Sequence, residues 1–258
     1  MPNGIQLSVP DRVAVITGGS RGIGAATVRM FVAAGARVLF NYRTDRGAAE
    51  RVVSECGAQS CAAVEADLRD VESARALVEH ATQRFGGVDI LVANHGIWPA
   101  EDVAVDRMTD RQWRDTIAIN LDSVFGLVKH AVAQMKKRAR GGHIVLVSST
   151  AGQRGEAFHC DYAATKGAVI SMVKGLSTEL AGDSIRVNCV APGWVATDMA
   201  APALNDPATR EKVFATIPLR RVATPEEIAV PILFLCTEHA GFITGEILNV
   251  NGGAVLVG

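Results

Sequence analysis

The stretch VAVITGGSRGIGAATV at residues 13–28 places a short apolar strand directly before a glycine turn and a helix. The glycines of the turn are Gly18, Gly22 and Gly24. Glycines in this position permit a tight turn and let a pyrophosphate approach the free N–H groups at the helix N-terminus. The stretch therefore predicts the first unit of a dinucleotide-binding fold. The other residues of the turn that we expect at the cofactor are Ser20, Arg21 and Ile23.

Alternation of strand and helix patterns continues along the chain. We expect strands at 13–17, 36–42, 60–66, 88–93, 143–149, 184–191 and 246–250. We expect helices at about 22–34, 46–55, 71–84, 110–138, 161–180 and 225–236. Strands this apolar suit a parallel sheet covered on both faces, with right-handed crossovers. The pattern predicts an α/β fold: a doubly wound parallel sheet of the Rossmann type, with three layers and about seven strands.

The domain organisation follows from the continuity of this pattern. No linker or low-complexity segment interrupts it, so we expect residues 1–258 to form a single NAD(P)-binding domain. The least regular part is roughly 192–224, which carries Pro and Gly and only fragments of helix. Loops beyond the carboxyl ends of parallel strands build the ligand site in such folds. We therefore expect 192–224 to be a lid over the substrate.

Composition excludes several classes of function. The formal net charge is -1 without a long run of one sign, which argues against a nucleic-acid surface. The five cysteines form no CxxC pair and the six histidines share no metal-ligand spacing with them, so we expect reduced thiols and no metal. We see no signal pattern and no window near the roughly 18 apolar residues of a membrane span. We expect a cytoplasmic protein without a membrane contact.

The end of the second predicted strand decides between NAD and NADP. An acidic residue at this position accepts both hydroxyls of the adenosine ribose. Here the end reads NYRTD, with Tyr42 in the place of the acid and Arg43 beside it. Together with Arg21, this arginine favours a 2′-phosphate, so we predict NADP (NADPH). The alternative is two solvated arginines, with Asp45 as the ribose acceptor and NAD as cofactor.

The end of the third predicted strand reads EADLRD. Asp67 is placed to hydrogen-bond the adenine amine, and Leu68 follows it at the cofactor. A helix cap is the alternative for Asp67, although Asp70 is better placed for capping.

Three further polar residues are expected at the same sheet edge. Ser149 ends the fifth predicted strand, and Tyr162 and Lys166 lie one turn apart on the next helix, in DYAATK. Together with TGGSRGIG, ANHG, INLDSVF and APGWVATDM, in this order, they resemble the short-chain dehydrogenase/reductase family of the single-domain type. The resemblance covers essentially the full chain, and it implies an NADP-dependent enzyme acting on CH–OH groups.

The chemistry of a ketone reductase explains these residue types. A free phenol with a pKa of about 10 exchanges its proton slowly at neutral pH. The Lys166 ammonium and the positive charge of oxidised nicotinamide are expected to lower the Tyr162 pKa, so that Tyr162 exchanges the proton with substrate. Lys166 would also bind the nicotinamide ribose, and Ser149 the carbonyl oxygen. A packing tyrosine beside an exposed lysine is the alternative.

The resemblance also implies a fourth catalytic residue and more cofactor contacts. Asn120 would anchor a water that links Lys166 to solvent, with a helix-bend asparagine as the alternative. The further cofactor contacts are Asn94, Gly96, Pro192, Gly193, Val195 and Thr197. His95 replaces the family's usual small residue, and we expect it to be tolerated rather than catalytic. His159 and Glu156 face the substrate side, where we expect exposed loop residues, with recognition of a polar group as the alternative.

Within the family, SVFGLVKHAV and KKRARGGHIVLVSS most resemble the 3-oxoacyl-[acyl-carrier-protein] reductases. This resemblance implies NADPH-dependent reduction of a 3-oxoacyl thioester, a homotetramer, and docking of acyl carrier protein near Arg140. Asp183 stands where a second docking cation is typical, and Asn251 stands where an Asp is common. The alternatives are a reductase of small ketones, sugars or other secondary alcohols, and a non-catalytic cofactor-binding regulator.

Overall fold

The computed structural model describes residues 4–256, and a parallel sheet of seven strands runs through them. The strand order is β3-β2-β1-β4-β5-β6-β7, and every neighbouring pair is parallel. The strands are β1 (Val13–Ile16), β2 (Arg37–Tyr42), β3 (Cys61–Glu65), β4 (Ile90–Ala93), β5 (Gly142–Val147), β6 (Ile185–Pro192) and β7 (Ile247–Val250). The predicted doubly wound α/β fold is confirmed.

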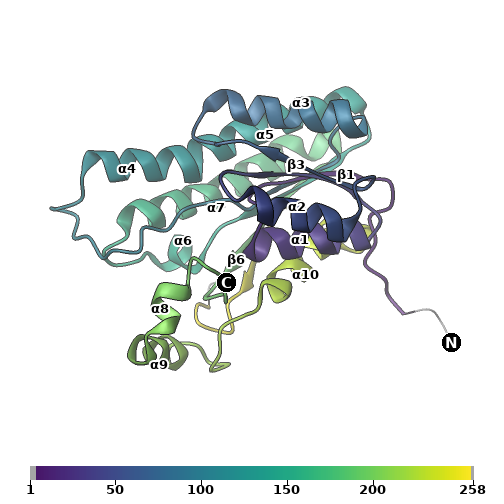
Figure 1. Cartoon of the computed structure of the whole chain (residues 1–258). Coiled ribbons are helices and arrows are strands. Elements are labelled where there is room, and N and C mark those ends of the chain that lie inside the picture. The colour runs from purple at the N-terminus through teal and green to yellow at the C-terminus, as the bar shows by residue number, and fades with distance from the viewer. Residues whose placement is uncertain (1–3, 257–258) are drawn as a thin grey trace.

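Helices cover both faces of the sheet, which gives the three layers. One face carries α3 (Val71–Phe85), α5 (Ser123–Arg138) and α7 (Cys160–Leu180). The other carries α1 (Gly22–Ala33), α2 (Arg46–Cys56) and α10 (Pro225–Cys236). Figure 1 shows the two groups on opposite sides of the strands. Short 3₁₀ turns follow α7 and α10, at Ala181–Asp183 and Glu238–Ala240.

The core has two halves because successive side chains of a strand point to opposite faces of the sheet. In β1, Val13 and Val15 pack on the side of α3, α5 and α7, whereas Ala14 and Ile16 pack on the side of α1 and α10. All four side chains are fully buried. Burial on both faces fixes the register of the central strands and therefore where their carboxyl ends lie.

The helix predicted at 110–138 is wrong in one respect, because it is interrupted. It consists of α4 (Asp110–Ile117), a π-helical turn at Ala118–Asp122, and α5. The buried Asn120 lies in this turn, and its side chain bonds both the N–H and the C=O of Ile97, at 2.8 and 2.9 Å. These long-range bonds hold the wider turn, which no local pattern announces.

Two segments complete the edge at the carboxyl ends of the strands. The short helix α6 (Thr150–Arg154), which the sequence did not predict, begins where Ser149 Oγ accepts a hydrogen bond from Ala151 N at 3.1 Å. Beyond β6, α8 (Ala201–Asn205) and α9 (Pro207–Ala215) project away from the sheet (Figure 1). Hydrogen bonds of Ala223 with Trp194 and Ala196 close the base of this segment. Among the helices of residues 4–256, none is long and apolar enough to cross a membrane.

Candidate active site

A cavity of about 370 Å³ lies at the carboxyl ends of the strands. It lies beside the adjacent strands β1 and β4, from which the connections run to opposite faces of the sheet. This switch point is where doubly wound sheets bind ligands. The cavity is lined by every predicted cofactor and catalytic residue except Gly24 and Asn120. It therefore brings together residues from the glycine turn after β1, from the ends of the five strands β2 to β6, and from α7.

The glycine turn is shaped to take a close ligand. Gly18 has a φ of +66°, a conformation that side chains with a Cβ rarely adopt, and a Cβ at Gly24 would clash with the Gly18 carbonyl. Sequence reasoning missed Asn41, which organises this turn from β2. Its Oδ1 accepts a hydrogen bond from Gly18 N at 3.0 Å, and its Nδ2 donates one to Ala66 O at 3.1 Å. A polar residue inside the apolar run VLFNY was the available signal.

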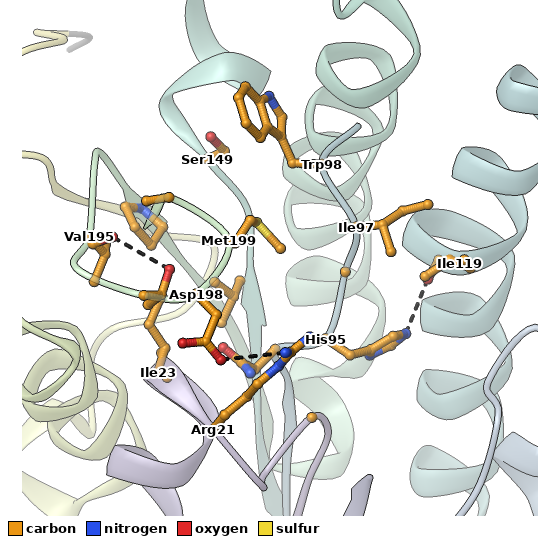
Figure 2. A pocket seen from close by; sticks show the side chains of 18 of the residues that line it. Arg21, Ile23, His95, Ile97, Trp98, Ile119, Ser149, Val195, Asp198 and Met199 are labelled. Carbon is orange, nitrogen blue, oxygen red and sulfur yellow. Dashed lines mark hydrogen bonds and ion pairs between the residues drawn. The ribbon is translucent and has the colours of Figure 1, made fainter. Parts of the chain in front are cut away.

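The adenosine end of the cavity is rich in guanidinium groups. Tyr42 is buried at the end of β2, while Arg43 next to it is exposed. Arg21 reaches Asp198 across the cavity mouth at 3.4 Å (Figure 2). Arg69, which the sequence analysis did not select, also lines the cavity.

Asp67 is paired with a neighbouring arginine, and its hydrogen bond to the adenine amine stays a prediction. Its carboxylate is held by the Arg69 side chain, and this hydrogen bond is the main cause that lowers the Asp67 pKa. Asp70 caps α3 as expected, because its side chain accepts a hydrogen bond from Glu72 N at 3.1 Å. A purine at this end would meet a carboxylate already paired with Arg69.

Ser149, Tyr162 and Lys166 converge in the cavity from β5 and α7. Ser149 and Tyr162 both line the cavity, and their interaction acts on the pKa of the Tyr162 hydroxyl. Lys166 is buried, its Nζ donates a hydrogen bond to Val147 O at 2.9 Å, and Nζ lies 5.8 Å from the centre of the Tyr162 ring. The backbone of α7 is fixed to β5 here, because Ser148 Oγ donates to Lys166 O at 2.8 Å.

The predicted lowering of the Tyr162 pKa is not what the protein's own groups produce. Burial raises the pKa of Tyr162 to about 12; the hydrogen bond with Ser149 opposes this rise, and the charge of Glu156 adds to it. Burial also lowers the pKa of Lys166 to about 8. The ammonium lies over the phenol ring and bonds a carbonyl of β5, so desolvation outweighs its attraction for a phenolate.

Asn120 lies behind the cavity. Besides Ile97, its Nδ2 reaches Thr165 Oγ1 on α7 at 3.4 Å. Gly96 lies between this asparagine and the lysine, since a Cβ there would be 3.2 Å from Asn120 Oδ1 and 3.5 Å from Lys166 Nζ. Asn120 therefore lies at the irregular turn of the helix, as the alternative role predicted. Only the small Gly96 separates its side chain from Lys166 Nζ.

His95 is a connecting residue, which sequence reasoning did not anticipate. Its Nδ1 lies 2.8 Å from Thr17 Oγ1 at the end of β1, and its Nε2 lies 2.6 Å from Ser123 Oγ and 3.1 Å from Ile119 O (Figure 2). Ser123 Oγ donates to Ile119 O at 2.6 Å and therefore accepts from Nε2, which leaves Nδ1 to accept from Thr17 Oγ1. This network assigns the neutral form protonated on Nε2.

Burial agrees with the neutral imidazole, because it lowers the pKa of His95 to about 4, with the nearby Lys166 charge as the second cause. The expectations for two other loop residues also need correction. His159 is only 2% exposed and Glu156 is half-buried, so neither is an exposed loop residue. In the described part of the chain, no group of three or more His, Cys, Asp or Glu residues is arranged to hold a metal ion.

Fold and cavity together define a nicotinamide-dependent oxidoreductase that acts on CH–OH groups. The cradle of the glycine turn, where Gly24 leaves no room for a side chain, fits the pyrophosphate of such a cofactor. A family model described as enoyl-(acyl carrier protein) reductase matches residues 18–255. The chain belongs to the short-chain dehydrogenase/reductase family.

Its curated relatives include ketone reductases. The chain is 39% identical over 252 residues to the 3-oxoacyl-[acyl-carrier-protein] reductase FabG of Salmonella typhimurium, a match that covers 97% of this chain and 100% of that protein. It is 37% identical over 242 residues to the enzyme of the same name from Staphylococcus aureus, over 93% and 96% of the two chains.

Among solved structures, a short-chain dehydrogenase/reductase from Brucella melitensis, described as glucose/ribitol dehydrogenase, matches with a TM-score of 0.89. It is 36% identical, and the match covers 98% of this chain and 100% of that one.

Proposed function

We propose that the protein is an NADPH-dependent carbonyl reductase that transfers a hydride to the ketone of a 3-oxoacyl thioester. The observation that carries this proposal is that Ser149, Tyr162 and Lys166 share one cavity with the glycine turn. A hydride donor and a proton donor can therefore reach the same carbonyl. The substrate class follows from the names of the Salmonella and Staphylococcus relatives.

The chain's own residues account for the proton. Bound NADPH supplies the hydride to the carbonyl carbon. Ser149 donates a hydrogen bond to the carbonyl oxygen and holds it beside the Tyr162 hydroxyl, which gives up its proton as the alkoxide forms. A Tyr162 pKa raised to about 12 keeps this phenol protonated at neutral pH, which suits the direction of reduction. Lys166 stabilises the phenolate that remains.

The remaining cofactor residues surround this centre in the cavity. Arg21 and Arg43 lie where a 2′-phosphate would bind, and their charge favours NADPH over NADH. At the nicotinamide end we place Asn94, Gly96, Pro192, Gly193, Val195 and Thr197. Asn120 holds the segment at Gly96 beside Lys166, and its anchoring of a water stays a prediction. The segment 192–224, which carries α8 and α9, is the lid, and the described residues 4–256 belong to one domain.

Assembly and partners extend the proposal. Phe125 on α5 is 59% exposed, which supports a homotetramer in which α5 and α7 pack against a second copy. Docking of an acidic carrier protein rests on the exposed Arg140, because Lys136 pairs with Asp183 at 2.7 Å. A cytoplasmic enzyme fits these substrates.

A second candidate is the reduction of a small ketone or sugar. The described activity of the Brucella structure favours it. It uses the same hydride and proton transfer and differs only in what the cavity recognises beyond the carbonyl.

The test follows NADPH consumption with an acetoacetyl thioester and with a crotonyl thioester, which offers a C=C bond in place of the ketone. We expect oxidation of NADPH only with the ketone, and slower oxidation of NADH at equal concentration. Turnover of the crotonyl thioester alone would mean that the enzyme is an enoyl reductase. Comparable rates with NADH would contradict the assignment of Arg21 and Arg43 to binding of the 2′-phosphate.

A further inference from the structure

The cavity contains a second group of side chains beside the position proposed for the reacting carbonyl. Trp98, Trp194 and Met199 line it together with Glu156 and Arg154. Figure 2 shows Trp98 and Met199 next to Ser149, the residue that would hold the carbonyl oxygen. A substrate bound there has its carbon skeleton between these groups. The proposed proton and hydride transfer uses none of them.

Trp98 is held in a fixed orientation. Its indole lies against the buried His159, with ring centroids 4.8 Å apart, and meets Trp194 nearly edge-on at 6.1 Å. His159 is fixed from behind by Asp102, 3.1 Å from its Nε2. The indole N–H, which can only donate, is among the causes that oppose the rise of the Glu156 pKa. The two tryptophans therefore form a rigid apolar wall.

Glu156 presents an acceptor inside this wall. It is half-buried, burial raises its pKa, and it lines the same cavity as Tyr162. An ionised carboxylate has about four acceptor sites, and a single indole N–H can fill only one of them. A half-buried carboxylate that loses water on substrate binding needs a replacement donor, because an unpaired acceptor is costly.

We propose that Glu156 and Trp98 form a substrate subsite for a ketone that carries a neutral hydroxyl group close to the carbonyl. The hydroxyl donates to the Glu156 carboxylate while the carbon skeleton lies against Trp98 and Trp194. Arg154 lines the same cavity, and its positive charge disfavours a cationic substrate group. This subsite rests on the proposed function, since it requires a carbonyl at Ser149 and Tyr162.

A matched pair of substrates tests the subsite: a 3-oxobutanoyl thioester and its 4-hydroxy derivative. A site that hydrogen-bonds a hydroxyl discriminates against the analogue without it, and for a half-buried carboxylate we expect a preference of about tenfold in kcat/KM. Glu156→Leu should reduce this preference to within about threefold, by slowing only the hydroxylated substrate. Glu156→Gln keeps a hydrogen-bond acceptor and the shape of the side chain, and should therefore retain part of the preference for the hydroxylated substrate.

Glu101→Leu is the control, because Glu101 is exposed and does not line the cavity. It should leave the preference unchanged, and Tm values show whether each variant is folded. Equal kcat/KM for both substrates in the wild type, or an equal loss for both in the Glu156 variants, would overturn the subsite but not the reductase. Preference for a 4-amino derivative would show that the subsite binds a cationic group, which would overturn its assignment to a neutral hydroxyl. Turnover of neither thioester would overturn the proposed function and the subsite together.

Discussion

At the scale of single residues, the site depends on groups whose charged forms burial disfavours. Lys166 and Tyr162 are both desolvated, which favours their neutral forms. The pKa of Lys166 is lowered to about 8, and the pKa of Tyr162 is raised to about 12. The protein keeps an ammonium in its interior next to Tyr162, the proposed proton donor. Such an arrangement costs stability and is retained where chemistry needs it.

Lys166→Met is therefore expected to stabilise the fold while it abolishes turnover. A folded pKa below the ordinary value means that the cost is fully present below about pH 8 and disappears as pH rises through about 10.5. The variant should unfold in urea with up to about 3 kcal/mol more free energy at pH 7, and this difference should shrink at pH 10. A variant less stable than the wild type at pH 7 would contradict this.

His95 should make stability depend on acid. Its pKa is lowered to about 4. The neutral imidazole therefore contributes fully to the stability of the fold above about pH 6.5, and this contribution is lost as pH falls toward 4. In His95→Gln the fall in unfolding free energy between these pH values should be smaller than in the wild type by up to about 3 kcal/mol. As a control, His239→Gln at an exposed histidine should show the same fall in unfolding free energy as the wild type. An unchanged fall in His95→Gln would show that the imidazole is not held neutral.

At the scale of elements, the glycine turn could be predicted and the π-helical turn could not. Gly18 and Gly24 follow an apolar strand directly, so their local pattern specifies the turn. The widened turn at Asn120 depends on bonds to Ile97 and on the His95 bridge, which join segments more than twenty residues apart. The same reason explains why sequence reasoning missed Asn41 and the hydrogen bonds of His95, and why it misjudged the exposure of Glu156 and His159.

Asn41 gives the prediction for the turn. Asn41→Ala removes the acceptor of Gly18 N and the donor to Ala66 O and leaves both backbone groups without a side-chain partner. We expect NADPH to bind about tenfold more weakly, measured by fluorescence titration, with kcat at saturating NADPH within about threefold of the wild type. A change in kcat with unaltered NADPH affinity would show that Asn41 acts elsewhere.

At the scale of the whole molecule, the alternation of strands and helices specified the layers, and the sheet order then determined which residues meet. Ser149 and Tyr162 lie on different elements, yet both reach the cavity because β4, β5 and β6 end at one edge. In the proposed subsite, substrate specificity depends instead on how the segments around Trp98, Glu156 and Trp194 pack together. That packing is set by contacts between loops, which strand and helix patterns do not encode.

The surface away from the cavity gives a prediction about carrier docking. Arg140→Glu should lower kcat/KM for a carrier-bound 3-oxoacyl substrate about tenfold and leave that for a small thioester unchanged, because only the carrier touches this surface. Arg111→Glu, on the exposed face of α4, is the matched control. Equal effects on both substrates would exclude docking at Arg140.

The central claim is that the Tyr162 hydroxyl protonates a ketone beside bound NADPH. The most direct measurement is single-turnover oxidation of NADPH with an acetoacetyl thioester, in the wild type and in Tyr162→Phe. We predict that the variant binds NADPH with unchanged affinity and reduces the thioester at least about a hundredfold more slowly. Reduction at the wild-type rate by a folded, NADPH-bound Tyr162→Phe protein would contradict the account.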